Sequence, residues 1–259
     1  MQRIQLGAVP NSTPSPVDSI QVEESVISVS EHRGGRHTLF VPLHYEPNYA
    51  YPLMVWLHGP GDDERQLQRI MPEVSLRNFA AIAPRSGTAV DTGRGFHWRQ
   101  TSGDIAAATD SIFECIAVAQ KRFHVSSQRI FLCGYDSGGT MALRIALNHP
   151  QKFAGAASIG GAFPQGSSPL LQLNGARKLP LLIAQGRQAT KYSVDTTCEE
   201  LRLFHAAGMS VSLRQYPGGD ELTTGMLRDL NLWIMEQVTG VQMFDSHDAG
   251  DPSAQDSPN

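Results

Sequence analysis

The chain has 259 residues, of which 41% are hydrophobic and 18% are charged, a balance that suits one sizeable buried core. A formal net charge of −4, without any run of Lys or Arg, excludes the cationic surface that nucleic acid or anionic lipid would need. No apolar stretch reaches the roughly 18 residues of a membrane span, and none near the first residue has signal-peptide length, so we expect a cytoplasmic protein.

The two ends of the chain differ in composition from the part between them. Residues 9–19 hold three prolines among small polar residues, and residues 244–259 are acidic and nearly free of hydrophobic side chains. Such segments bury too little apolar surface to fold. We therefore expect disordered tails at residues 1–19 and 241–259 and one folded domain over residues 20–240.

The predicted elements begin with two strands at residues 24–30 and 36–42, where apolar and polar side chains alternate as in a hairpin. Five continuous apolar runs follow, each typical of a strand covered on both faces: YPLMVWLHG, NFAAIAP, RIFLCG, FAGAASIGG and LPLLIAQG. A further strand is predicted over residues 211–217, and helical patterns lie over 104–122, 140–148, 195–207 and 221–238. This alternation predicts an α/β fold, with a mostly parallel, doubly wound sheet and helices on both faces.

A glycine-rich turn follows the run RIFLCG and precedes the predicted helix. Gly134-Tyr135-Asp136-Ser137-Gly138 has the G-x-S-x-G spacing of a nucleophile elbow, whose glycines allow a tight strand-to-helix turn that exposes the central side chain. Asp136 stands where the serine belongs. A shift of register that made Ser137 the nucleophile would turn its side chain away from the apex of the turn.

Four blocks of sequence, taken in order, resemble the α/β-hydrolase superfamily. They are PLMVWLHGPGDDE, RIFLCGYDSGG, LPLLIAQGRQA and RQYPGGDE. The chain is most similar to the compact phospholipase/carboxylesterase branch, to which feruloyl esterases and polyhydroxyalkanoate depolymerases are near relatives. The resemblance covers residues 36–238 and implies an α/β-hydrolase fold, and the short segment between FAGAASIGG and LPLLIAQG leaves no room for a cap domain.

The resemblance also implies where a Ser-Asp-His triad would lie. The nucleophile position holds Asp136, the acid position of the third block holds Ala189, and the base position of the fourth holds Asp220. The oxyanion donors would come from the loop after His58, where Gly59 has an amide hydrogen and Pro60 has none, and from the amide of Ser137.

All three triad positions are therefore changed. A carboxylate is a far weaker nucleophile toward esters than an activated hydroxyl, and an ionised Asp220 is a much poorer base than an imidazole. We predict a catalytically inactive esterase homologue with a binding or scaffolding role, its vestigial pocket suited to a small acyl-type ligand. The three cysteines lack metal-ligand spacing, so we predict reduced thiols and neither a cofactor nor a metal site.

Two alternatives stay open at this point. Asp136 and Asp220 could form an unconventional hydrolase site, sharing a proton or holding a divalent cation. Two facing carboxylates repel each other when both are ionised, so one would have a raised pKa or a cation would sit between them. His58 or His97 could replace the missing base. In the other alternative, both aspartates are solvated loop residues and side chains fill the cleft.

Overall fold

The computed structural model describes residues 27–32, 35–91, 93–166 and 168–241. Apart from residue 241, the two expected tails lie outside these ranges, as do residues 20–26 of the expected domain. None of the helices in the described ranges is long and apolar enough to cross a membrane.

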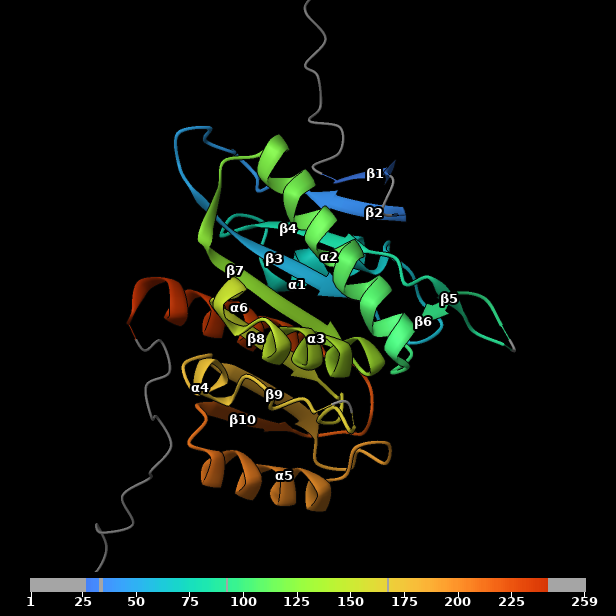
Figure 1. Cartoon of the computed structure of the whole chain (residues 1–259). Coiled ribbons are helices and arrows are strands. Elements are labelled where there is room, and N and C mark those ends of the chain that lie inside the picture. Colours follow the sequence, from blue (N-terminus) through green and yellow to red (C-terminus); the bar gives the residue numbers. More distant parts are fainter. Residues whose placement is uncertain (1–26, 33–34, 92, 167, 242–259) are drawn as a thin grey trace, which may run out of the picture.

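Eight strands form one sheet in the order β1-β2-β4-β3-β7-β8-β9-β10 (Figure 1). The strands β1 to β2 and β2 to β4 pair antiparallel, and the remaining neighbours pair parallel. The predicted mostly parallel sheet with an antiparallel hairpin at its start is confirmed. The bounds are β1 Ile27–His32, β2 Gly35–Phe40, β3 Tyr51–Leu57, β4 Ala80–Pro84, β7 Val125–Tyr135, β8 Gly155–Ile159, β9 Leu181–Gly186 and β10 Val211–Tyr216.

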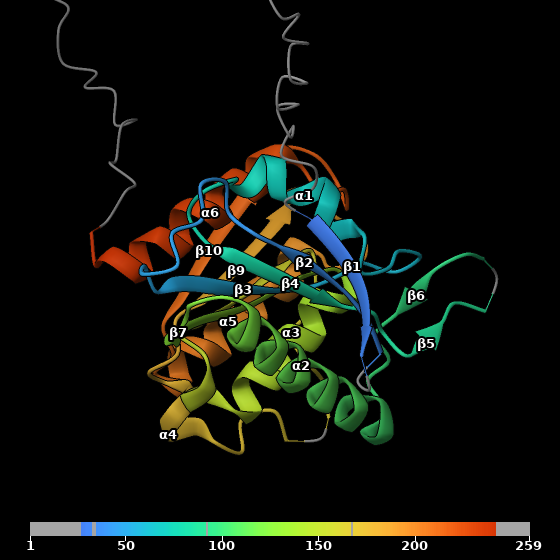
Figure 2. The ribbon, with the colours of Figure 1, turned by 90° about the horizontal axis from the view of Figure 1, so that it is seen from above.

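Helices cover both faces of this sheet, as the sequence predicts. Figure 2 shows α1 (Gln66–Val74) and α6 (Thr224–Thr239) on one side and α2 (Ser102–Arg122) and α3 (Ser137–Asn148) on the other. Helix α5 (Val194–Ala207) packs on the side of α2 and α3, and its Phe204 lies in the core cluster that residues of α2 and α3 also form. Parallel strands joined by such crossovers place their carboxyl ends at one edge, where α/β proteins build their sites.

Strand β3 shows how one segment serves both cores. Leu53, Val55 and Leu57 pack into the cluster under α2 and α3, whereas Met54 and Trp56 pack into the cluster under α1 and α6. Successive side chains of a strand point to opposite faces, so a strand buried on both faces needs apolar residues at every position. The unbroken apolar run in the sequence has this cause.

Four parts of the structure were not predicted: helix α1, the 3-10 helix η1 (Pro150–Lys152), the short helix α4 (Leu173–Ala176), and the hairpin of β5 (Thr88–Ala89) and β6 (Phe96–His97). The hairpin projects from the side of the sheet in Figure 1. In the described residues between β8 and β9, α4 is the only helix. The three cysteines are free thiols, as expected, and Cys115 and Cys133 are buried.

Candidate functional site

The turn between β7 and α3 has the backbone geometry of a nucleophile elbow. Asp136 has φ 52° and ψ −121°, a conformation that residues other than glycine rarely adopt. A Cβ on Gly134 would lie 2.4 Å from the Gly138 carbonyl oxygen, and a Cβ on Gly138 would lie 2.3 Å from that of Leu57. The tight turn is therefore kept, with an aspartate at its apex.

The carboxylate at this apex forms an ion pair with Lys191. The Lys191 ammonium nitrogen donates to Oδ2 of Asp136 at 2.7 Å, and the two side chains are 58% and 20% exposed. This hydrogen bond is the main cause that raises the pKa of Lys191 above its ordinary value. The ammonium group therefore stays protonated, and an ion pair occupies the place where a serine hydroxyl would meet an ester carbonyl.

Asp220 is held by the turn that follows β9. Its Oδ1 accepts from the backbone amides of Thr190 at 3.0 Å and Lys191 at 3.1 Å, and its Oδ2 accepts from the Thr190 hydroxyl at 2.6 Å. The Thr190 hydroxyl is the largest cause of a pKa below the ordinary value for Asp220. A carboxylate stabilised in its ionised form is a weak proton acceptor.

The three predicted triad positions lie together in space. Asp220 contacts Thr190, which adjoins Ala189, and Lys191 extends from the same turn to Asp136. The Tyr135 hydroxyl, one residue before Asp136, also donates to the Asp220 carbonyl oxygen. A lysine of the chain itself lies against Asp136, whereas the alternative raised from the sequence placed a divalent cation between Asp136 and Asp220. No group of three or more His, Cys, Asp or Glu suited to a metal occurs among the described residues.

The loop after β3 does not present a free amide to the elbow. The Gly59 amide donates to Oε1 of Gln66 at 3.2 Å, and the Gly61 amide donates to the Phe96 carbonyl oxygen at 3.0 Å. Pro60, between them, has no amide hydrogen. The predicted oxyanion role of Gly59 therefore has no donor available in this conformation. The Ser137 amide opens α3, where backbone amides have no partner within the helix.

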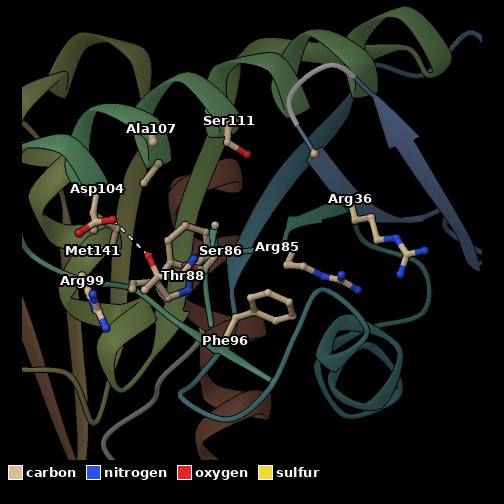
Figure 3. A pocket seen from close by; sticks show the side chains of 14 residues that line it. Arg36, Arg85, Ser86, Thr88, Phe96, Arg99, Asp104, Ala107, Ser111 and Met141 are labelled. Atoms are coloured by element: carbon tan, nitrogen blue, oxygen red, sulfur yellow. Dashed lines mark hydrogen bonds between the residues drawn. The ribbon is translucent and has the colours of Figure 1, made fainter. Parts of the chain in front are cut away.

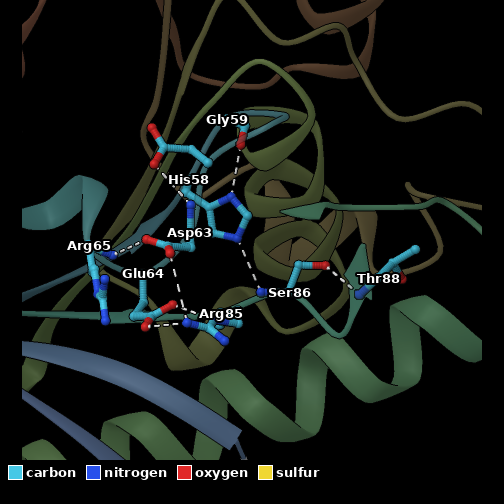
Figure 4. A network of polar contacts seen from close by, with 9 residues as sticks. His58, Gly59, Asp63, Glu64, Arg65, Arg85, Ser86 and Thr88 are labelled. Carbon is cyan, nitrogen blue, oxygen red and sulfur yellow. Dashed lines mark hydrogen bonds and ion pairs between the residues drawn. The ribbon is translucent and has the colours of Figure 1, made fainter. Parts of the chain in front are cut away.

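His58 lies beneath this loop as part of a polar network (Figure 4). The side chain is fully buried; its Nδ1 donates to the Gly59 carbonyl oxygen at 2.8 Å, and its Nε2 accepts from the Ser86 amide at 3.1 Å. Because a carbonyl only accepts and an amide only donates, these partners fix one neutral tautomer. Burial lowers the pKa of His58. Both ring nitrogens are engaged, so His58 has no lone pair for a substrate.

His97 and Ser137 also have other partners. His97 lies on β6, and its Nε2 accepts from Nε of Arg99 at 3.0 Å. It does not line the pocket beside Asp136. The Ser137 hydroxyl oxygen accepts from the Trp98 amide at 3.4 Å, a long hydrogen bond, and lines that pocket. No histidine of the described part of the chain lines the same pocket.

Two cavities lie on either side of Trp98. The smaller, of about 210 Å³, adjoins the elbow and is lined by Trp98, Gln100, Asp136, Ser137, Thr140, Gly160, Gly161, Ala162, Lys191 and Tyr192. We call it the elbow pocket. The larger, of about 770 Å³, lies between α2 and the β5–β6 hairpin (Figure 3). In Figure 3, Arg36 and Arg85 lie at one end of it and Arg99 and Asp104 at the other.

The charged groups of the larger cavity have partners within the protein. Arg85 donates through Nε and Nη2 to the buried carboxylate of Glu64 at 2.6 and 2.8 Å and stacks over Phe96. Asp104 accepts from the hydroxyls of Thr101 and Thr88 and lies in the first turn of α2. These bonds hold the hairpin against the body of the protein.

Comparison with known proteins places this geometry in a family. A family model described as Phospholipase/Carboxylesterase matches residues 46–231. The chain belongs to this family. Carboxylesterase SOBER1 of Arabidopsis thaliana is 27% identical over 211 residues, which cover 74% of this chain and 92% of that protein. A probable carboxylesterase of Oryza sativa subsp. japonica is 26% identical over 209 residues, covering 73% and 79%.

Solved structures of carboxylesterases share the fold of this chain. A carboxylesterase from Mesorhizobium loti has a TM-score of 0.66 at 19% identity and covers 82% of this chain and 99% of its own. The crystal structure of SOBER1 has a TM-score of 0.59 at 21% identity and covers 73% of this chain. The predicted resemblance to the α/β-hydrolase superfamily is confirmed.

Two of the residues that were not predicted decide the chemistry of the site. Lys191, which pairs with Asp136, and Gln66, which takes the Gly59 amide, carry no motif of their own. Gln66 gave no indication, because helix α1, on which it lies, was itself not predicted. Lys191 gave none, since an exposed lysine in a loop is ordinary.

Proposed function

We propose that this member of the phospholipase/carboxylesterase family does not hydrolyse esters and uses the elbow pocket to bind a small acyl-type molecule. The ion pair of Asp136 with Lys191, at the apex of an intact elbow, carries this proposal. An attack on an ester requires a nucleophile activated by a base. Here the apex carboxylate is neutralised by an ammonium group, and the base position holds a carboxylate that already has three hydrogen bonds.

The loop after β3 supports the same proposal. Removing one preorganised donor to a developing oxyanion lowers turnover on the order of 10²–10³-fold. In this chain the Gly59 amide is bound to Gln66 and Pro60 has none to give. Nucleophile, base and oxyanion donor are thus all altered, while the fold and a pocket of about 210 Å³ beside the elbow are kept.

The alternative of a working site built on Asp136 and Asp220 needs both carboxylates to face a substrate or a cation. Each has a partner from the turn after β9: the Lys191 ammonium on Asp136, and the Thr190 hydroxyl with two amides on Asp220. We therefore favour the binding role. In the alternative, adding Mn²⁺ would create hydrolytic activity that wild-type protein lacks without it.

The test is an assay of p-nitrophenyl acetate hydrolysis together with labelling by a fluorophosphonate probe. We expect neither turnover above a heat-denatured sample nor covalent labelling, with or without Mn²⁺. Ser137→Ala serves as the control, because any labelling that it abolishes assigns the nucleophile to Ser137. Stoichiometric labelling of the wild type, or turnover that saturates with substrate, would show that the protein is an enzyme.

A further inference from the structure

Helix α5 carries a buried carboxylate whose hydrogen-bond partners are both neutral. Glu200 is 7% exposed, and its Oε2 accepts from the Tyr192 hydroxyl and from the Phe163 amide at 3.3 Å. Burial raises the pKa of Tyr192, so its hydroxyl keeps the proton and donates it to the carboxylate. Two donors match an ionised carboxylate. A buried charge without an opposite charge is costly, and buried charges in native proteins are usually paired.

The other oxygen of this carboxylate can be reached by a ligand. Oε1 of Glu200 accepts no hydrogen bond from the described residues, yet it keeps some solvent-accessible surface. Glu200 lines a cavity of about 410 Å³, which we call the α5 groove. The other residues that line the α5 groove are Phe163, Pro164, Gln165, Gly166, Ser168, Pro169, Leu170, Leu171 and Leu203.

Packing holds the carboxylate in place between the α5 groove and the elbow pocket. The Phe163 ring packs edge-on against Phe204, one helical turn after Glu200, with ring centroids 4.9 Å apart. Tyr192, which donates to Glu200, lines the elbow pocket. Among the described residues, none lines both cavities. The α5 groove is therefore a separate site, whose occupancy does not depend on whether the elbow hydrolyses esters.

Glu200 sets the charge of the α5 groove, because it is the one ionisable side chain among the described residues that line it. Arg144 bonds to the wall, donating to the carbonyl oxygens of Gln165 at 2.6 Å and Gly166 at 2.9 Å. Burial raises the pKa of Glu200, and its two hydrogen bonds oppose the rise, but no charged side chain of the described chain contributes to the shift. Arg144 therefore does not compensate this carboxylate.

The rest of the α5 groove is largely apolar and selects the kind of cation. Leu171 and Leu203 are 81% and 48% exposed, so an apolar chain has a surface to cover. A metal ion needs several ligands, and the described residues contain no group of three or more His, Cys, Asp or Glu suited to one. A guanidinium group favours both oxygens of a carboxylate, but Oε2 already accepts two hydrogen bonds. An ammonium group needs only one oxygen.

We infer that the α5 groove binds a small free alkylammonium ion, whose ammonium group donates to Oε1 of Glu200 and whose alkyl chain packs against Leu170, Leu171 and Leu203. A volume of about 410 Å³ lies within the range of about 300–1,000 Å³ typical of small-molecule sites. A free molecule fits better than a lysine of a partner peptide, because the carbonyl oxygens of Gln165 and Gly166, which a peptide backbone would contact, already accept from Arg144.

Three compounds with the same alkyl chain test the charge preference: hexylammonium, 1-hexanol and hexanoate. Calorimetric titration of the full chain should show hexylammonium binding at least about tenfold more tightly than 1-hexanol, and hexanoate binding more weakly than either. The methyl signals of Leu170, Leu171 and Leu203 should shift in ¹H–¹³C spectra. Equal affinity for the three compounds, no binding of hexylammonium at about 10 mM, or shifts confined to other leucines would overturn the inference.

A fourth compound distinguishes the free ion from a lysine side chain. Nα-acetyl-lysine methylamide carries the same ammonium group on a peptide unit. It should bind at least about tenfold more weakly than hexylammonium. Tighter binding of this compound than of hexylammonium would assign the α5 groove to a lysine of a partner protein and overturn the inference of a free ligand.

Variants of two neighbouring glutamates make the test specific. Glu200→Gln keeps an acceptor for Tyr192 and Phe163 but removes the charge, and should weaken hexylammonium binding at least about tenfold. Glu199→Gln makes the same change at an exposed position of α5 and should leave the affinity unchanged. Urea unfolding checks that both variants fold, and the wild-type affinities for the three hexyl compounds need no variant. Unaltered hexylammonium binding by folded Glu200→Gln would contradict the inference.

Discussion

His58 is a single residue whose protonation is tied to the fold. Burial lowers its pKa below the ordinary 6.5, although the Gly59 carbonyl oxygen and the carboxylates of Asp62, Asp63 and Glu64 act in the opposite direction. The folded state therefore favours the neutral ring, and the unfolded state binds the proton more readily. This contribution to stability is complete above pH 6.5 and is lost as the pH falls from there through the pKa of the folded state.

We expect the free energy of unfolding to fall between about pH 7.5 and about pH 5.5, and His58→Asn to reduce that slope. Urea titrations at both pH values measure it. The window lies above the range in which Asp220 and Asp104 titrate, because their pKa values are below 3.8. His205→Asn is the matched control, because it makes the same substitution at an exposed position of α5. If the free energy of unfolding of His58→Asn depends on pH as steeply as that of the wild type, groups other than His58 cause the dependence.

The ion pair of Lys191 with Asp136 matters for the chemistry of the site and contributes little to the free energy of unfolding. The lysine side chain is 58% exposed, so solvent screens the pair strongly. Lys191→Met should lower the free energy of unfolding by no more than about 1 kcal/mol, and less at high salt. Guanidinium chloride is itself a salt, so urea titrations with and without added NaCl are the measurement. A loss of more than about 2 kcal/mol would mean that the pair supports the fold.

At the scale of elements, the elbow depends on how closely α3 approaches β3. The absent side chain of Gly138 allows this approach, because a Cβ there would meet the carbonyl oxygens of Leu57 and His58 at 2.3 and 2.5 Å. Backbone atoms cannot give way as the end of a flexible side chain can. The elbow therefore packs closely against the start of the loop after β3, and this contact does not depend on whether the site hydrolyses esters.

Gly138→Ala should destabilise the protein by about 1–3 kcal/mol through this overlap. Gly103→Ala is the matched variant, because that glycine lies near the start of α2 with nothing within 4 Å of its added Cβ. It should be neutral or raise stability by about 0.4–1 kcal/mol. The comparison uses the midpoints and slopes of urea unfolding. Equal effects of the two substitutions would show that the close approach at Gly138 is not maintained in solution.

For the molecule as a whole, hydrophobic periodicity predicted the parts with long, regular patterns. The strands β3, β4, β8 and β9 and the helix α2 follow from it, because doubly buried strands and a 21-residue helix leave clear signals. Helix α1 was not predicted, because Pro72 lies inside it and polar residues interrupt its apolar pattern. Strands β5 and β6 have two residues each, too few to show a period.

The site was predictable where it follows a motif and hidden where it depends on distant contacts. The apex residue and the two other triad positions come from the four sequence blocks, and the structure brings them together. The contact of Lys191 with Asp136 joins residues 55 positions apart in the chain. Only the fold decides which exposed lysine reaches the apex, as it decides that Gln66 takes the Gly59 amide.

The central claim is that the changes at the three triad positions, more than the engaged amides of the loop after β3, account for the proposed absence of hydrolysis. The direct measurement compares hydrolysis of p-nitrophenyl butyrate by the wild type and by the triple variant Asp136→Ser, Ala189→Asp, Asp220→His. The control carries Asp136→Ala with the other two changes and so lacks a nucleophile. We predict background rates for the wild type, the control and each single change, and a rate measurably above background for the triple variant, since triad residues act as a unit. Hydrolysis by the wild type at the rate of the triple variant would contradict the account.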